Sequence, residues 1–110
     1  MTLGERIRKE RKAAGLSQRD LAQRVGVSFP HISKVEADKE PASPELLTRI
    51  AQEVGIEPDE LLLLAGRVPS ELSEVVVNKH TLAPRFLRSW KAGTITDEDV
   101  EAFLNQREGR

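Results

Sequence analysis

Cysteine is absent from this chain of 110 residues. Its absence excludes disulfides, thiolate zinc sites, iron–sulfur clusters and cysteine nucleophiles. Long hydrophobic runs are also missing, because the longest, Leu61 to Ala65, is far shorter than the ~20 residues that a membrane-spanning helix needs. The charged N-terminus has no hydrophobic segment of the kind found in signal peptides. We therefore expect a cytoplasmic protein with no membrane association.

A large net charge is missing as well, since the formal value is −1, and the strongly basic character typical of nucleic-acid-binding domains is absent. The charges are nevertheless unevenly spread. Residues 1–39 hold nine basic and five acidic side chains, residues 40–66 hold one and six, and residues 67–110 hold seven of each. This layout suggests a basic face for a polyanion and an acidic face kept away from it, although chance clustering on solvated helices explains it equally well.

Hydrophobic periodicity and capping residues predict five short helices in the first 66 residues. They begin near residues 3, 17, 28, 43 and 58 and end near residues 14, 25, 37, 54 and 65. No strand alternation interrupts them, so the predicted fold class is all-α. The expected apolar stripes comprise Leu3, Ile7, Ala14, Leu16, Leu21, Ala22, Val25, Ile32, Val35, Leu47, Ile50, Ala51 and Val54.

The last third of the chain carries weaker signals for three more helices. Pro69 and Ser70 can start the first, and residues 81–90 can form the second. Thr96 with Asp99 has the spacing of a capping box, which predicts the start of the third. Three consecutive valines at 75–77 leave a strand open as an alternative there. We expect two parts, a compact domain over residues 1–66 and a helical extension over residues 67–110.

The segment from Gln18 to Ala37, QRDLAQRVGVSFPHISKVEA, has the pattern of a helix-turn-helix. Two short helices joined by a tight turn need a small residue where they cross and a glycine in the turn, and Ala22 and Gly26 supply them. In such a motif the second helix enters the DNA major groove with its N-terminal residues at the base edges. Here that helix is predicted over residues 28–37.

The stretch from Leu3 to Gly66, with GLSQRDLAQRVGVSFPHISKVE at its centre, resembles the Cro and lambda-repressor-like helix-turn-helix family, also called XRE. The resemblance implies a five-helix domain that binds double-stranded DNA and regulates transcription. It also implies that Arg11 on the first helix pairs with Glu36 at the end of the recognition helix, as part of the scaffold. The sequence departs from the family pattern at Phe29–Pro30 and at Ala37–Asp38.

The predicted DNA-binding residues lie around the two helices of this motif. Gln18 matches the family position that holds a phosphate, although glutamine is also an ordinary exposed helix residue. Lys34 can reach a guanine or a phosphate, and Phe29 either packs on a thymine methyl group or is half-buried in the core. The complete predicted set is Gln18, Arg19, Ser28, Phe29, Pro30, His31, Ser33, Lys34 and Lys39. A helix-turn-helix that has lost DNA binding would keep Ala22 and Gly26, so these two residues do not distinguish a DNA-binding motif from one that no longer binds DNA.

Enzymatic chemistry has no support in the sequence. There is no nucleophile with a base beside it, no glycine-rich phosphate loop and no cluster of histidines and acids. His31 and His80 are far apart and no cysteine accompanies them, so we expect neither a metal nor a cofactor. The acidic residues that begin the last predicted helix complement its dipole instead.

Residues 67–110 contain most of the chain's few aromatic side chains, and interface cores are enriched in aromatics. A helix-turn-helix of this size reads few base pairs, so specific binding usually needs a dimer on a palindromic operator. The predicted dimerisation residues are Leu82, Phe86, Leu87, Trp90, Val100, Phe103 and Leu104. Two alternatives remain. These helices can pack onto the first domain, or they can bind a partner protein, as in an antitoxin or adaptor that uses DNA binding for autoregulation. The leading hypothesis is a homodimeric transcriptional repressor.

Overall fold

The computed structural model describes residues 1–109, and over that range the chain forms eight α-helices and no strand. The predicted all-α class is therefore confirmed. The chain divides into two compact units, one from Met1 to Pro69 and one that begins at Ser70. None of the helices in the described range is long and apolar enough to cross a membrane.

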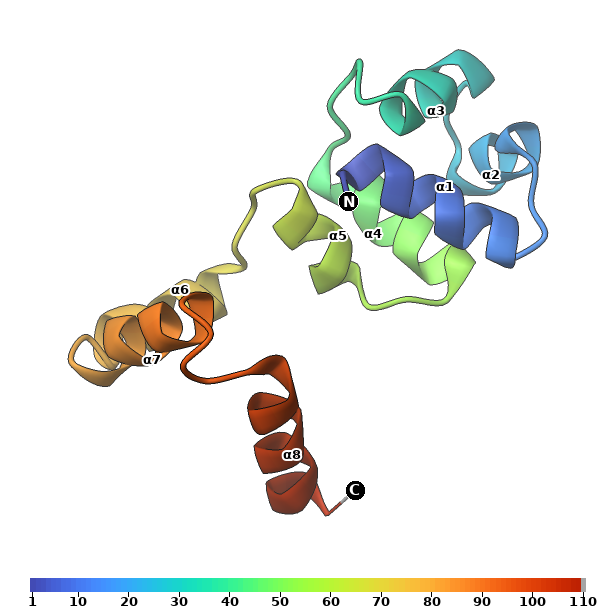
Figure 1. Ribbon diagram of the computed structural model, residues 1–110. Helices are drawn as coiled ribbons and strands as arrows, with labels where there is room; N and C mark the ends of the chain where they lie inside the picture. Colours follow the sequence, from blue (N-terminus) through green and yellow to red (C-terminus); the bar gives the residue numbers. More distant parts are fainter. Residues whose placement is uncertain (110) are drawn as a thin grey trace. The chain divides into compact units, whose positions relative to one another are not determined.

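The first unit consists of five helices (Figure 1). They are α1 (Leu3–Ala13), α2 (Gln18–Val25), α3 (Phe29–Glu36), α4 (Pro44–Val54) and α5 (Pro58–Leu64). Helix α1 contacts α3, α4 and α5, while α4 also contacts α2 and α2 contacts α3. The helix-turn-helix pair α2 and α3 is thereby held against the rest of the unit by two different helices.

Local signals in the sequence place the ends of these helices. The hydroxyl groups of Thr2, Ser17, Ser28 and Ser43 each accept a hydrogen bond from the backbone N–H three residues later, which satisfies one free donor of the first helical turn. At the other end, Gly26 stops α2 with φ of 76°, a left-handed conformation that glycine adopts at little cost. The helix boundaries are accordingly within a residue or two of those predicted.

One hydrophobic core fills the space between the five helices. Its largest fully buried side chains come from every helix of the unit: Ile7, Leu21, Val25, Ile32, Val35, Leu47, Ile50 and Leu61. Four of the side chains placed on the predicted stripes are less buried than expected. Ala14, the C-cap of α1, is exposed, and Leu3, Leu16 and Val54 only border the core.

The second unit contains α6 (Ser70–Asn78), α7 (Leu82–Lys91) and α8 (Asp97–Glu108). The valines at 75–77 lie inside α6, so the strand alternative is wrong. Helix α8 begins with the predicted capping box, in which Thr96 and Asp99 exchange hydrogen bonds between side chain and backbone. Helices α6 and α7 contact one another, yet none of these three helices contains a buried residue.

Candidate nucleic-acid interface

The turn between α2 and α3 is short and tightly specified. Gly26 takes the left-handed conformation, and the N–H of Val27 donates to the carbonyl oxygen of Ala22 at 3.0 Å. Ser28 then caps α3, with its Oγ accepting from the N–H of His31 at 3.3 Å. Pro30 lies in the first turn of α3, where a missing N–H leaves no helical hydrogen bond unmade. These features set the direction in which α3 leaves the turn.

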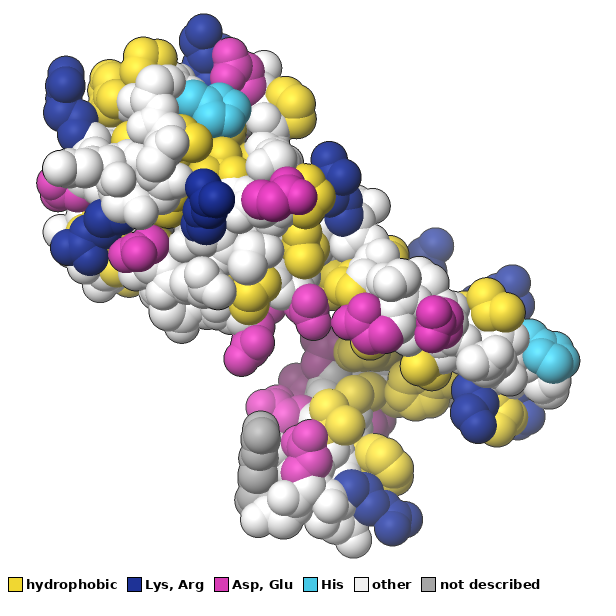
Figure 2. All heavy atoms as spheres, turned by 180° about the vertical axis from the view of Figure 1, so that it is seen from behind, with side chains coloured by type: hydrophobic (Ala, Val, Ile, Leu, Met, Phe, Trp, Pro, Cys, Tyr) yellow, Lys and Arg dark blue, Asp and Glu magenta, His cyan; other side chains and the backbone are white. Residues whose placement is uncertain are grey.

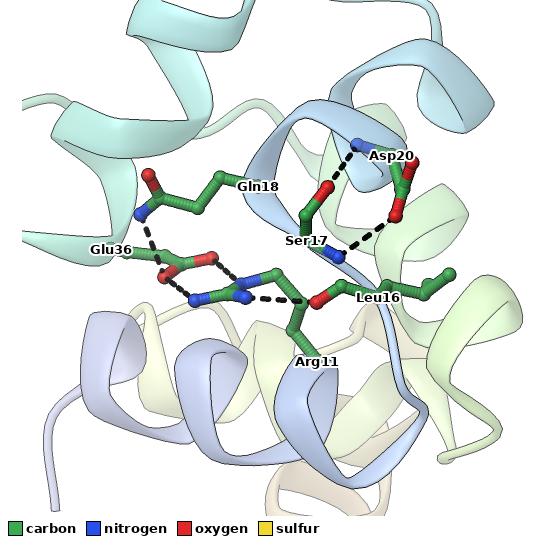
Figure 3. Close-up of polar contacts among 6 residues, drawn as sticks. All are labelled: Arg11, Leu16, Ser17, Gln18, Asp20 and Glu36. Carbon is green, nitrogen blue, oxygen red and sulfur yellow. Dashed lines mark hydrogen bonds and ion pairs between the residues drawn. The ribbon is translucent and has the colours of Figure 1, made fainter.

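A buried ion pair joins α1 to the end of α3 (Figure 3). Arg11 Nε donates to Glu36 Oε2 at 2.7 Å and Arg11 Nη2 donates to Glu36 Oε1 at 3.0 Å, with the side chains only 8% and 3% exposed. The remaining nitrogen, Nη1, donates to the carbonyl oxygen of Leu16 at 2.9 Å. This bidentate geometry restrains both partners, so Arg11 positions the recognition helix and the loop before α2 together.

Gln18 lies in the same network. Its Nε2 donates to Glu36 Oε1 at 3.1 Å, and its side chain is partly buried between α2 and α3 (Figure 3). The side-chain amide has two N–H donors and a carbonyl oxygen, so one hydrogen bond to Glu36 leaves capacity for a phosphate. The predicted phosphate contact is thus compatible with a structural role that the sequence did not reveal.

The departure at Ala37–Asp38 has a structural explanation. Asp38 has φ of 59°, and its carboxylate accepts from the N–H of Gly4 at 2.9 Å and from the hydroxyl of Thr2 at 2.7 Å. The loop after α3 is therefore fastened to the start of α1. A Cβ on Gly4 would lie 2.3 Å from the carbonyl oxygen of Glu36, so this close approach requires glycine. A glycine inside a predicted helix was the available signal for this contact.

Phe29 occupies the leading end of α3 and is half-buried. It packs against the edge of the core, and the Arg19 guanidinium lies 4.5 Å from its ring centroid. The half-buried alternative therefore describes its environment in the free protein. Arg19, predicted to contact DNA, is held over the ring by a cation–π interaction.

Glu40 is a functional candidate that sequence reasoning missed. Its carboxylate lies 2.7 Å from His31 Nδ1 through Oε2 and 3.4 Å from Lys34 Nζ through Oε1. Two predicted base-reading side chains, three residues apart on one face of α3, therefore share one carboxylate. The His31 hydrogen bond, assisted by Lys34, lowers the pKa of Glu40 from its ordinary value.

The separation of charge into a basic and an acidic face is wrong. Acidic residues of the 40–66 segment pair with basic residues of the first segment, as in Arg6–Glu60 and Arg24–Glu53, each at 3.5 Å. Figure 2 shows acidic side chains lying among Lys and Arg side chains on one face of the molecule. The sequence order of charges did not reveal this mixing because the helices of the unit fold back on one another.

The remaining predicted contacts lie on the outer surface of the motif. Pro30 and Lys39 are exposed and Ser33 is partly exposed, while Ser28 is occupied as the α3 cap. The main-chain N–H of Lys39 donates to the carbonyl oxygen of Lys34 at 2.8 Å, which fixes the start of the following loop. In the described range no group of three or more His, Asp or Glu side chains is arranged to hold a metal ion.

The predicted dimerisation residues lie on two helices of the second unit. Leu82, Phe86, Leu87 and Trp90 belong to α7, and Val100, Phe103 and Leu104 belong to α8. Phe86 and Trp90 meet edge to face with ring centroids 5.9 Å apart, and Trp90 Nε1 donates to Asp97 at 2.6 Å. Val100 is partly buried, and the other six are between 37% and 63% exposed. Figure 2 shows hydrophobic side chains at the surface of this unit.

Comparison with known proteins places the motif in a family. A helix-turn-helix family model matches residues 7–61, which is half of the chain. An HTH-type transcriptional regulator of Mycobacterium tuberculosis is 40% identical over 73 residues, covering 66% of this chain and 52% of that protein. The propionyl-CoA carboxylase regulator of Cereibacter sphaeroides is 29% identical over 76 residues, covering 68% of this chain and 16% of that protein.

A solved structure has a similar fold over nearly the whole length. It is a chain of a SinR protein/SinI protein complex, 22% identical, with a TM-score of 0.55 and coverage of 99% of this chain and 97% of that chain. The chain spans about half the length of the mycobacterial relative it matches.

Proposed function

This chain belongs to the helix-turn-helix family of DNA-binding transcriptional regulators, and from that membership we propose that it is a repressor that binds a palindromic operator as a homodimer. The observation that supports the proposal is the way in which α3 is held in the first unit. Its inner face is buried, its end is held by the Arg11–Glu36 pair, and its outer face keeps polar side chains at the surface. The repressor role rests on the resemblance of residues 3–66 to Cro and lambda-repressor-like proteins.

In the proposed complex, the start of α3 reads base edges and the surrounding residues hold the backbone. Ser28, Phe29, Pro30, His31 and Lys34 lie at the base edges, where Lys34 donates to guanine and Phe29 contacts a thymine methyl group. Gln18 and the N-terminus of α2 bind one phosphate. The other proposed backbone contacts are Arg19, Ser33 and Lys39.

Binding to DNA selected from a random pool tests this assignment. Phosphate contacts release counterions, so log K should fall with log salt at a slope of about −0.9 per contact. Gln18→Ala should weaken binding to all sequences, and Lys34→Ala should also relax preference at particular bases. Lys91→Ala removes the same charge from α7 and should change neither property strongly. Equal affinity for selected and random DNA at every salt concentration would contradict the proposal.

The proposed dimer contact is the exposed apolar surface of α7 and α8. Aromatic and leucine side chains that remain 37–63% exposed within their own unit are available to bury surface against a second copy. Sedimentation of the full chain at tens of micromolar should give a dimer, and Trp90→Ala should shift it toward monomer. Leu63→Ala, at an exposed leucine of α5, should leave assembly unchanged. A wild-type monomer would refute the dimer.

A second candidate function is a regulator whose helices α6–α8 bind a different protein, as an antitoxin or adaptor does. The similar fold of a chain from a SinR protein/SinI protein complex favours keeping this candidate. It predicts a chain that is monomeric alone and that purifies with one other protein at fixed stoichiometry. Loss of that protein on Trp90→Ala, with DNA binding by the first unit intact, would support this candidate over the homodimer.

A further inference from the structure

Glu40 presents its two carboxylate oxygens to two different side chains of α3. Oε2 lies 2.7 Å from His31 Nδ1, and Oε1 lies 3.4 Å from Lys34 Nζ. The His31 and Glu40 side chains are 31% and 37% exposed, so they are neither buried nor freely solvated. The loop after α3 thus returns a negative charge to the helix that is proposed to face a polyanion.

For the neutral His31 ring, this geometry selects one tautomer. A carboxylate is only an acceptor, so the ring nitrogen facing it must carry the hydrogen. In a neutral imidazole with hydrogen on Nδ1, the other nitrogen, Nε2, holds a lone pair and accepts hydrogen bonds. Without Glu40, either nitrogen can carry the hydrogen, and the ring can present a donor or an acceptor to a base.

The major groove distinguishes these two forms. An acceptor at Nε2 matches the amino groups of adenine N6 and cytosine N4, whereas guanine presents only acceptors at N7 and O6. A neutral ring with the hydrogen on Nε2 would instead match acceptors, which are guanine N7 and O6, thymine O4 and adenine N7. The tautomer of His31 therefore decides whether it reads a donor or an acceptor on the base edge.

We propose that Glu40 is a positioning residue for base recognition, which holds the neutral His31 ring with Nδ1 toward the carboxylate so that Nε2 accepts from an adenine or cytosine amino group. The proposal rests on the assignment of α3 as the helix that reads the operator. A second consequence follows from charge. Glu40 also repels phosphates and occupies Lys34, so it lowers affinity for DNA of every sequence while it sharpens the choice of base.

The tautomer can be measured in the free protein without DNA. Nitrogen-15 spectra of the imidazole rings at alkaline pH distinguish hydrogen on Nδ1 from hydrogen on Nε2, and His80→Gln identifies the His31 signals. Wild type should show hydrogen on Nδ1. Glu40→Gln should show both tautomers because its amide can accept from Nδ1 or donate to it, and Glu40→Ala should move toward hydrogen on Nε2. Glu45→Ala, at an exposed glutamate of α4, is the matched control and should match wild type.

Selection of bound DNA from a random pool then tests the effect on readout. Wild type should prefer adenine or cytosine at one position of each half-site, by about three- to tenfold for one hydrogen bond. His31→Ala and Glu40→Ala should lose that preference at the same position, and Glu40→Gln should weaken it. Glu40→Ala and Glu40→Gln should both bind random DNA more tightly than wild type does.

Two results would overturn the inference. One is hydrogen on Nε2 of His31 in the wild-type protein. The other is a Glu40→Ala variant that gains affinity for all DNA and keeps every base preference of the wild type. That result would mean that Glu40 acts on DNA binding only through its charge. Neither of these two results would contradict the proposed function. A wild-type protein that selects no sequence would instead refute the proposed function together with this inference.

Discussion

The two units of this chain begin helices with the same capping motif but differ in how much hydrophobic surface those helices bury. Each contains a capping box, Ser17 with Asp20 before α2 and Thr96 with Asp99 before α8. The first unit then buries a core of twelve hydrophobic residues and one ion pair, whereas α6, α7 and α8 bury no residue. Caps and periodicity are therefore sufficient to place helices, but they do not determine what the helices pack against.

Because the two units differ in buried surface, we expect them to have different functions. A unit with its own core and a satisfied buried ion pair can present α3 in one orientation. A unit whose aromatic side chains remain 37–56% exposed has surface left for another molecule. Four experiments test whether this division holds.

Truncation after Pro69 should have the largest effect on operator binding. A folded first unit should keep its affinity for a half-site, but loss of the tethered partner should weaken binding to the full operator by roughly 10² to 10⁴. Titration of full and half operators with both chains measures this. A truncated chain that binds the full operator as tightly as the intact chain would remove the dimerisation role of the second unit.

Breaking a polar pair should matter far more in the first unit than in the second. Glu36→Ala strands a buried guanidinium and should lower the free energy of unfolding by about 3 to 5 kcal/mol. Asp97→Ala removes an exposed acceptor from Trp90 and should cost about 1 kcal/mol or less. Urea denaturation followed by circular dichroism measures both. Equal free energies of unfolding in urea for Glu36→Ala and wild type would show that the buried pair has no structural role.

Shortening a leucine should give a similar contrast. Leu47 is fully buried, so Leu47→Ala should destabilise the first unit by about 2 to 5 kcal/mol. Leu104 is 46% exposed, and at protein concentrations too low for assembly Leu104→Ala should change stability by about 0.5 kcal/mol or less. A large loss for Leu104→Ala under these conditions would indicate that the second unit has a core of its own in solution.

The smallest contrast between the two units should come from the caps, where they are alike. Ser17→Ala and Thr96→Ala should each lower the free energy of unfolding of their own unit by about 1 kcal/mol.

The backbone and hydroxyl of Ser17 lower the pKa of Asp20. The contribution of the Asp20 carboxylate to stability is therefore present above the ordinary carboxyl range and is lost as the pH falls through the lowered pKa. Thermal melts of Asp20→Asn and wild type should therefore converge on acidification. A constant difference between them would contradict this cause.

Most of the fold was predictable because its signals are local. Ser17, Gly26, Ser43 and Gly55 mark helix ends by chemistry that acts within a few residues, and the structure confirms those ends. The all-α class followed from the same signals. The errors lie where distant segments meet. One of the two interpretations of the charge segments placed them on separate faces, yet Arg6 pairs with Glu60 because α1 and α5 are neighbours.

Sequence alone determined the helices, the helix-turn-helix and the family resemblance, since each depends on residue types at short and fixed spacings. The resemblance also implied the Arg11–Glu36 pair, which the structure contains. Only the tertiary structure decided how the loop after the recognition helix is held. Gly4 against the backbone of Glu36, Asp38 at the start of α1, and Glu40 against His31 all depend on a loop that turns back after α3. No periodicity encodes such contacts, because their geometry is set by how whole helices pack and not by the spacing of residues within one of them.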